Sequence, residues 1–184
     1  MAISPANEVS NDIVYIQIVI DTDAIIADNP TPSTNADSPT GLAHNYMYMV
    51  ATRGNVFTPQ SEGTADLNVK AITGDVIRWY AVSENGNFDT AVAIYKIARY
   101  DSSADVFSAV DFNVFTRTGI LPTDRTTFPI TFSLQNYWFN SATILKTGTE
   151  NYSISFALYR HTRDQAEPVL FGYFWWDPTL TIQY

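Results

Sequence analysis

Two acidic residues at alternate positions, Asp21 and Asp23, directly follow the first apolar run of the chain. On an extended segment such side chains share one face and lie about 6–7 Å apart, as the rise of a strand dictates. Two carboxylates at this spacing fit a calcium site or the acid and base of a glycosidase. They also fit a strand end that points into water, so the pair by itself leaves three interpretations open.

A second set of oxygen-bearing side chains, Asn85, Asn87 and Asp89, recurs at alternate positions of a polar turn. This is the 1, 3, 5 spacing of a calcium-binding loop. The EF-hand pattern ends there, because Thr90 occupies the glycine position and Lys96 occupies the position of the bidentate glutamate. Asn-Gly turns are also common in β-hairpins. If the two acidic stretches meet, we expect a Ca²⁺ site made by Asp21, Asp23, Asn85, Asn87 and Asp89.

Catalytic patterns are otherwise missing from the sequence. It contains two histidines, no cysteine and no G-x-S-x-G motif, so neither a nucleophilic triad nor a thiolate is indicated. We expect His161 to be an exposed loop residue. His44 either bonds to loop backbone or contacts a ligand. The sequence therefore predicts a protein that is not an enzyme.

Carbohydrate is the ligand that the polar loops suggest. Trp79, Trp175 and Trp176 would then either stack on a sugar ring or pack in the core. The residues that we expect to touch the ligand are polar members of the same two stretches: Asn29, Asn35, Asp37, His44 and Glu84.

The elements that would position these residues are strands. Apolar and polar residues alternate in many short runs, and no helical period is convincing. Two runs, Asp75–Val82 and Thr90–Ile97, predict a hairpin of central core strands around the turn Ser83–Asp89. The other expected strands are Asp12–Ile20, Asn45–Thr52, Asp66–Ile72, Val110–Thr116, Thr127–Leu134, Asn151–Arg160, Val169–Trp176 and Thr179–Gln183.

These strands predict an all-β protein: a single-domain antiparallel β-sandwich, jelly-roll-like, over residues 1–184. Residues 1–11 are expected to be a flexible N-terminus. Residues 21–44 hold four carboxylates and three prolines without Lys or Arg. We expect them to form a long ordered acidic loop after the first strand, anchored by Ile25, Ile26 and Leu42.

Net charge and hydropathy restrict the classes of partner that the protein could bind. The net charge of −9 argues against nucleic acid and anionic membranes. No run approaches the length of a membrane span and the N-terminus lacks a basic region, so we expect no membrane insertion and a cytoplasmic protein as synthesised. Inclusion bodies or non-classical release are compatible with this. A homo-oligomer, dimeric or larger, is expected.

Six phrases follow one another along the chain: Ile20-Asp21-Thr22-Asp23, Asn29-Pro30, Pro39-Thr40-Gly41, His44-Asn45-Tyr46, Gly74-Asp75-Val76-Ile77-Arg78-Trp79 and Gly172-Tyr173-Phe174-Trp175-Trp176-Asp177-Pro178. In this order they resemble the AidA/PixA family of bacterial proteins, also called the inclusion body protein family. The resemblance covers about Asp12 to Ile182 and implies a small non-catalytic protein of Gram-negative bacteria, often under quorum-sensing or phase control. It carries no catalytic residues.

Three functions follow as hypotheses. The first is a lectin-like module that recognises a glycan, with or without calcium, in host interaction. The alternative is a self-assembling intracellular inclusion-body or storage protein without a small-molecule ligand. The third is a hydrolase that uses Asp21 or Asp23 as general acid.

Overall fold

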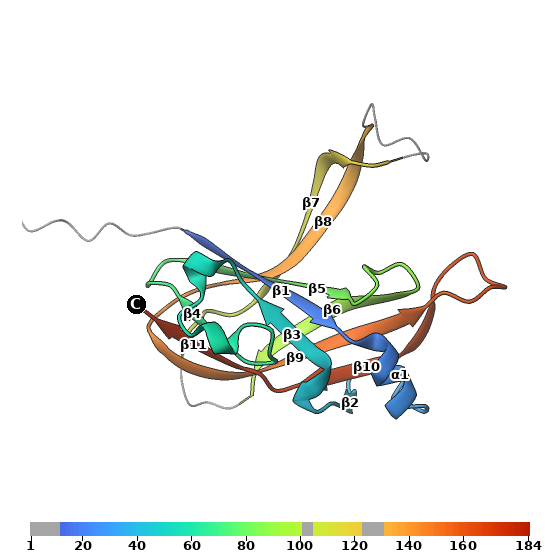
Figure 1. Cartoon of the computed structure of the whole chain (residues 1–184), viewed down its shortest axis with the longest axis horizontal. Helices are drawn as coiled ribbons and strands as arrows, with labels where there is room; N and C mark the ends of the chain where they lie inside the picture. Colours follow the sequence, from blue (N-terminus) through green and yellow to red (C-terminus); the bar gives the residue numbers. More distant parts are fainter. Residues whose placement is uncertain (1–11, 101–104, 123–130) are drawn as a thin grey trace, which may run out of the picture.

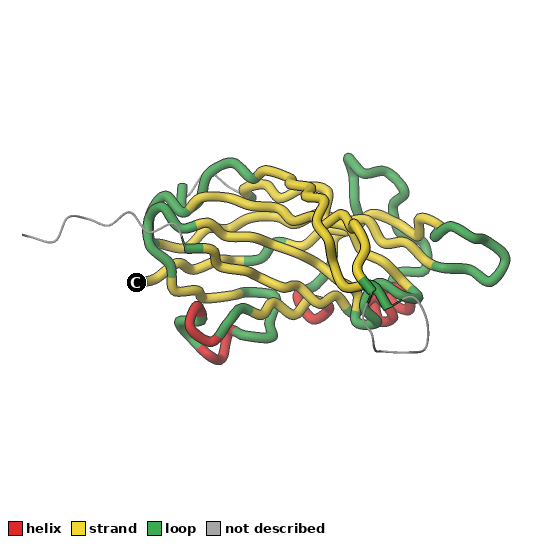
Figure 2. The backbone as a smooth tube through the Cα atoms, turned by 90° about the horizontal axis from the view of Figure 1, so that it is seen from above, coloured by secondary structure: helices red, strands yellow, loops and turns green. Residues whose placement is uncertain are grey.

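The computed structural model describes residues 12–100, 105–122 and 131–184, which fold mainly into strands in two mixed sheets (Figure 1). The N-terminus 1–11 lies outside the described residues, as do positions 127–130 of one expected strand. In the perpendicular view, the strands run roughly along the long axis and the helical segments lie along one side (Figure 2).

The first sheet has the strand order β3-β1-β5-β8-β7. The central strand β5 is parallel to β1 and antiparallel to β8. The strands are β1 (Ile13–Ile20), β3 (Met47–Val50), β5 (Val76–Ser83), β7 (Asp111–Ile120) and β8 (Phe132–Thr143).

The second sheet is built around its longest strand, β9 (Gly148–Arg160). Strand β6 pairs with β9 antiparallel, and β10 and β11 pair with successive parts of β9. Strands β2 and β4 then add in parallel to β10 and β11. Their bounds are β2 (Thr40–Gly41), β4 (Leu67–Lys70), β6 (Thr90–Arg99), β10 (Val169–Trp176) and β11 (Thr179–Gln183).

Both sheets contribute to one hydrophobic core. The alternation in β1 buries Val14, Ile16, Ile18 and Ile20, because successive side chains of a strand point to opposite faces. Large aromatic residues fill the centre, where the Trp79 ring lies 5.5 Å from Phe107 and 6.0 Å from Tyr152. The all-β prediction is confirmed at this level.

The prediction of antiparallel sheets is wrong in part, because β1/β5, β2/β10 and β4/β11 are parallel pairs. The predicted hairpin is also wrong. Strand β5 lies in the first sheet and β6 in the second, so the turn between them crosses from sheet to sheet. A polar turn between two apolar runs permits either arrangement, and only the long-range partners β8 and β9 decide between them.

The acidic segment after β1 is not one long loop. It begins with helix α1 (Thr22–Asp28) and includes β2, before a 3₁₀ helix at His44–Tyr46. Further 3₁₀ turns lie at Arg53–Asn55 and Pro59–Ser61. Ile25 and Leu42 are buried and Ile26 packs against the core, so the segment is anchored by the predicted side chains.

One part of the first sheet extends away from the body of the molecule (Figure 1). Strand β8 pairs with β5 only over Asn140–Thr143, and the rest of β8 pairs with β7 alone. We call this two-stranded extension, made by residues 112–120 and 132–139, the arm. The sequence predicted a strand that ends at Leu134, but the structure has one continuous strand of 12 residues that extends to Thr143.

Candidate functional site

The acidic segment and the polar turn Ser83–Asp89 do meet. The carboxylate of Glu84 accepts hydrogen bonds from the backbone N–H of Thr22 at 2.8 Å and from its hydroxyl at 2.8 and 2.9 Å. The same hydroxyl lies 2.6 Å from that of Thr90. The first turn of α1 is therefore tied to the crossover between the sheets.

The amide side chains of the turn are engaged in holding its backbone. Asn85 Oδ1 accepts hydrogen bonds from the N–H groups of Phe88 and Asp89 at 3.0 and 3.2 Å. Asn87 Oδ1 accepts from Ser83 N at 2.9 Å, and Asn87 itself adopts a left-handed φ of 61°. These are the local side-chain-to-backbone bonds that Asn forms in turns.

The residues expected to bind calcium have different roles in the structure. Asp21 caps α1 by accepting from Ala24 N at 3.0 Å, whereas Asp23 and Asp89 are exposed. In the described part of the chain, no hydrogen bond joins Asp21 or Asp23 to Asn85, Asn87 or Asp89. No group of three or more His, Cys, Asp or Glu side chains suited to a metal occurs among the described residues. The calcium site stays a prediction without structural support.

The residues expected to touch a ligand are spread along the same segment. Asn29 caps the end of α1, with its Nδ2 donating to Ile25 O at 3.0 Å. Asn35 Oδ1 accepts from Asp37 N at 3.0 Å within an exposed loop. Asn29 and Asn35 bond within the acidic segment, whereas Glu84 bonds across to Thr22. The two cavities described below are not lined by these side chains.

His44 lies between two carboxylates. Its Nδ1 is 3.2 Å from Asp66 Oδ2 and its Nε2 is 3.3 Å from Asp177 Oδ1, with all three side chains more than two fifths exposed. Partial burial lowers the pKa of the imidazole, but hydrogen bonds to Asp177 and Asp66 outweigh this and raise the pKa above 6.5. Asp66 also accepts from Thr179 N at 2.7 Å, so the cluster ties together three segments distant in sequence.

The three tryptophans considered for sugar stacking, Trp79, Trp175 and Trp176, do not form an open stacking surface beside the polar loops. Trp79 and Trp176 are fully buried, so their alternative as core residues is confirmed. Trp175 is half-buried, and its ring is stacked on Tyr100 at 5.9 Å.

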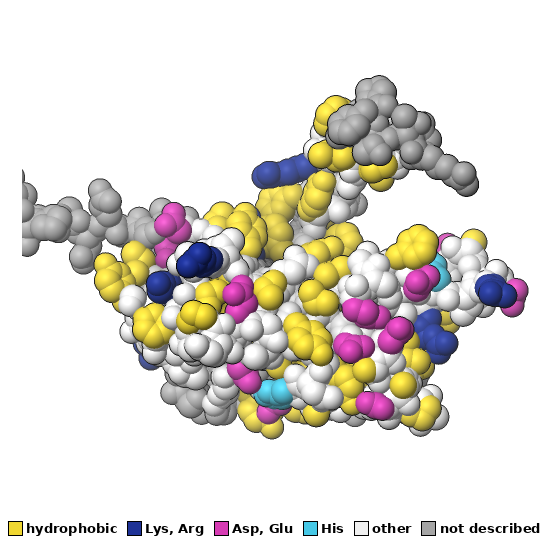
Figure 3. Space-filling view, in the orientation of Figure 1, with side chains coloured by type: hydrophobic (Ala, Val, Ile, Leu, Met, Phe, Trp, Pro, Cys, Tyr) yellow, Lys and Arg dark blue, Asp and Glu magenta, His cyan; other side chains and the backbone are white. Residues whose placement is uncertain are grey.

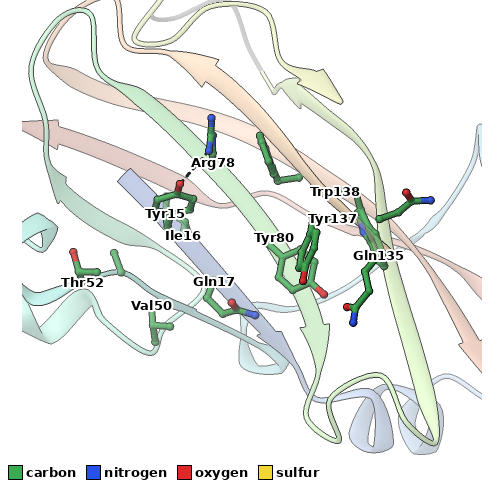
Figure 4. A pocket seen from close by; sticks show the side chains of 13 residues that line it. Tyr15, Ile16, Gln17, Val50, Thr52, Arg78, Tyr80, Gln135, Tyr137 and Trp138 are labelled. Atoms are coloured by element: carbon green, nitrogen blue, oxygen red, sulfur yellow. Dashed lines mark hydrogen bonds between the residues drawn. The ribbon is translucent and has the colours of Figure 1, made fainter. Parts of the chain in front are cut away.

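A cavity lies between the outer face of the first sheet and the base of the arm (Figures 3 and 4). It has a volume of about 710 Å³, in the range of small-molecule sites. We call it the arm cleft. Its lining is aromatic and amide-rich: Tyr15, Ile16, Gln17, Val50, Ala51, Thr52, Arg78, Tyr80, Gln135, Asn136, Tyr137, Trp138 and Phe139.

Arg78 is the charged residue of this lining. Its Nη1 donates to the Tyr15 hydroxyl at 3.0 Å, and its guanidinium lies 4.3 Å from the centre of the Phe139 ring. No described carboxylate is within ion-pair distance of it. A smaller adjoining cavity of about 410 Å³ brings Arg117 from the arm to the same region.

Aromatic side chains form the wall opposite β1. Tyr80 on β5 lies 6.0 Å from Trp138 on β8, measured between ring centres. Burial raises the pKa of the Tyr80 phenol, so it remains a hydrogen-bond donor at neutral pH. The cleft opens because β8 leaves β5 after Trp79 and exposes this outward face.

Sequence reasoning missed the arm cleft, although one signal pointed to it. In β5 the residues Arg78 and Tyr80 alternate with the buried Ile77, Trp79 and Ala81. The alternation showed that they share a face, but it did not show that the face is partly covered.

The arm carries a second feature that the sequence did not reveal. Register pairs Ile120 with Phe132 and Thr118 with Leu134, which places these side chains on one face of the hairpin. Phe112 and Val114 lie on the same face, because side chains two positions apart along a strand point to the same side. Phe132 is 70% exposed and Leu134 is 72% exposed. Hydrophobic side chains are visible along the arm in Figure 3.

Together these features define a class: a two-sheet β protein with an unpartnered apolar arm above an aromatic cleft. The chain belongs to the PixA family of inclusion body proteins, whose family model matches residues 12–182. The resemblance drawn from the sequence is thereby confirmed.

A solved relative shares the fold. The crystal structure of an inclusion body protein of the PixA family from Burkholderia cenocepacia J2315 is similar with a TM-score of 0.80 and 28% sequence identity, covering 97% of this chain and 99% of that one. No curated protein matches the chain. Among the described helices, none is long and apolar enough to cross a membrane.

Proposed function

We propose that this protein is a self-assembling inclusion-body protein whose copies associate through the apolar face of the arm. This was the alternative hypothesis from the sequence, and the family supports it better than the lectin-like one. The single observation that carries it is the exposed apolar face of β7 and β8. The underlying scaffold we infer to be a β-sandwich with both sheets around one core; jelly-roll connectivity stays a prediction.

The arm is poorly stabilised on its own. A two-stranded hairpin is marginal in water unless a further layer covers its hydrophobic face. Five large apolar side chains lie uncovered on this face: Phe112, Val114, Ile120, Phe132 and Leu134. Burying one such side chain fully stabilises by about 1.5–3 kcal/mol, so a partner that covers several of them is favoured strongly.

A second copy of the chain is the partner that fits best. Net charge of −9 makes two copies repel in general. Strands β7 and β8 contain one carboxylate, Asp111 at the base of the arm, and one cationic side chain, Arg117. The arm therefore lets two acidic molecules approach with little like-charge repulsion. Strand β7 is also an open sheet edge, which can add a further strand.

Replacing Phe132 and Leu134 together by Ser tests the proposal. Sedimentation velocity over a dilution series should show wild-type mass rising with concentration. Because two apolar contacts per copy are removed, we expect the double variant to dissociate at least about tenfold more readily. Phe88→Ser is the matched control, since Phe88 is 79% exposed but lies on the turn of the body; it should associate like wild type.

Two outcomes would contradict this function. One is a wild-type protein that stays monomeric at every concentration reached, and the other is a double variant that assembles as well as wild type. Circular dichroism of the variants would confirm that their secondary structure is kept.

A further inference from the structure

The arm cleft has a chemistry that self-association does not use. Its walls belong to strands β1, β3, β5 and β8, and Figure 4 shows side chains from these strands projecting into the space between them. The exposed apolar face of the arm is made by other residues. Asn136 and Trp138 of the cleft lie on the same face of β8 as Phe132 and Leu134, but none of the five exposed apolar side chains of the arm lines the cleft. Binding in the cleft would be a function beyond self-association.

The aromatic side chains of the cleft suit a ring-shaped ligand. Tyr15 lies on one wall, and Tyr80, Tyr137 and Trp138 lie on the other. Aromatic faces pack against the apolar face of a sugar ring, and phenol groups add hydrogen-bonding capacity at the rim. Such a surface is rigid, because each aromatic side chain loses little rotamer freedom on binding.

The polar side chains of the cleft suit hydroxyl groups. Three primary amides line it, from Gln17, Gln135 and Asn136, together with the hydroxyl of Thr52. Each amide offers both donors and acceptors. Within the arm, Gln135 Nε2 donates a hydrogen bond to Ile120 O, and Asn136 Oδ1 accepts one from the Thr116 hydroxyl. Each amide keeps further donors and acceptors that can serve a ligand in the cleft.

The charge of the cleft suits an anion. Its thirteen lining residues include one guanidinium and no carboxylate, in a chain with a net charge of −9. Arg78 is held in place by Tyr15 and Phe139, and one of its N–H groups is used by Tyr15. The remaining N–H groups of a planar guanidinium match the two oxygens of a carboxylate.

We infer that the arm cleft binds an acidic saccharide, with its ring between the aromatic walls, its hydroxyls on the amides and its carboxylate on Arg78. A hydrocarbon chain is a poorer occupant, because it would leave the amides and phenols without partners at a cost of about 1–3 kcal/mol for each buried group. The apolar arm of a second copy would be a poorer occupant of the cleft for the same reason. Nucleic acid is disfavoured by the overall negative charge.

The test uses glucuronic acid and glucose as probes, followed by calorimetry and by ligand-observed NMR on the full chain. Glucuronic acid should bind, and glucose should bind about tenfold more weakly because it lacks the carboxylate. Arg78→Gln should remove the preference for glucuronic acid, and Gln17→Ala should weaken both sugars. Gln60→Ala is the control, because Gln60 is an exposed amide outside the cleft.

Arg78 also packs on Phe139, so Arg78→Lys provides a second variant that keeps the charge and loses the two-pronged geometry. It should retain part of the preference if the near-ultraviolet spectrum shows native aromatic packing. The inference is overturned if neither sugar binds, if Arg78→Gln keeps the full preference, or if decanoate binds in their place. The Phe132/Leu134 double variant should bind glucuronic acid normally, which separates this site from self-association.

Discussion

His44 is the titratable side chain whose surroundings lead to a prediction about pH. Two carboxylates outweigh its partial burial, so its pKa in the folded protein lies above the 6.5 of the free side chain. The folded state therefore binds the proton more tightly than the unfolded chain does. The resulting stability is fully present below about pH 6.5 and is lost as the pH rises through the higher folded pKa.

His44→Gln should accordingly lower the melting temperature more at about pH 5.5 than at about pH 8.5. The effect is at most about 1 kcal/mol, because all three side chains are more than two fifths exposed and water screens the pair. Thermal unfolding at the two pH values measures it, with His161→Gln as the control. Equal destabilisation at both pH values would show that the two carboxylates do not hold a proton on His44.

At the scale of an element, the segment from Pro30 to Gly41 is held along strand β10. Tyr173 N donates to Ser33 O at 2.8 Å, and β2 pairs in parallel with Phe174 and Trp175. Gly172 permits this approach, because a Cβ there would lie 2.5 Å from Pro32 Cγ. A glycine inside a strand often marks the close approach of a neighbour, and here the neighbour is Pro32.

Gly172→Ala should therefore displace the segment and destabilise the protein by about 1–3 kcal/mol, as overpacking does. Denaturant unfolding measures the loss, and hydrogen exchange at the Tyr173 amide reports whether its bond to Ser33 has opened. Gly54→Ala is the matched control, because a Cβ at Gly54 meets nothing within 4 Å. Unchanged exchange at Tyr173 in the Gly172 variant would contradict this account.

At the scale of the whole molecule, charge acts in opposite directions on the two proposed interactions. The chain carries a net charge of −9 and has a sequence pI of about 4.4. Self-association brings like charges together, so added salt should strengthen it by screening. Binding of glucuronic acid joins Arg78 to a carboxylate, so added salt should weaken it.

Sedimentation and calorimetry at about 0.05 M and about 0.5 M sodium chloride compare the two responses. Lowering the pH toward the pI should also promote assembly, because the net repulsion decreases. The Phe132/Leu134 double variant should show little assembly at either salt concentration. If salt dissolved the wild-type assemblies, ionic contacts rather than the apolar arm would hold them together.

The sequence by itself determined the local structure of the strands. Alternation places Val14, Ile16, Ile18 and Ile20 in the core, and β10 and β11 have the bounds that the pattern predicts. A period of two is a property of neighbouring residues, so it can be read without knowing the partners. The sequence also excluded disulfides, since it has no cysteine.

The chemistry of Asn and Asp could be predicted only as alternatives. Asp21, Asn85 and Asn87 carry the oxygens of a metal loop, but the same oxygens cap helices and turns. Which use applies depends on the backbone groups within reach. The structure brings N–H donors to these three side chains.

Only the tertiary structure decided which strands pair and which surfaces remain open. Strands β5 and β6 are neighbours in sequence, yet they belong to different sheets because each pairs with a strand far along the chain. The departure of β8 from β5 after Trp79 creates both the arm and the cleft. Such pairings depend on long-range hydrogen bonds and shared burial, and no local pattern of residues encodes them.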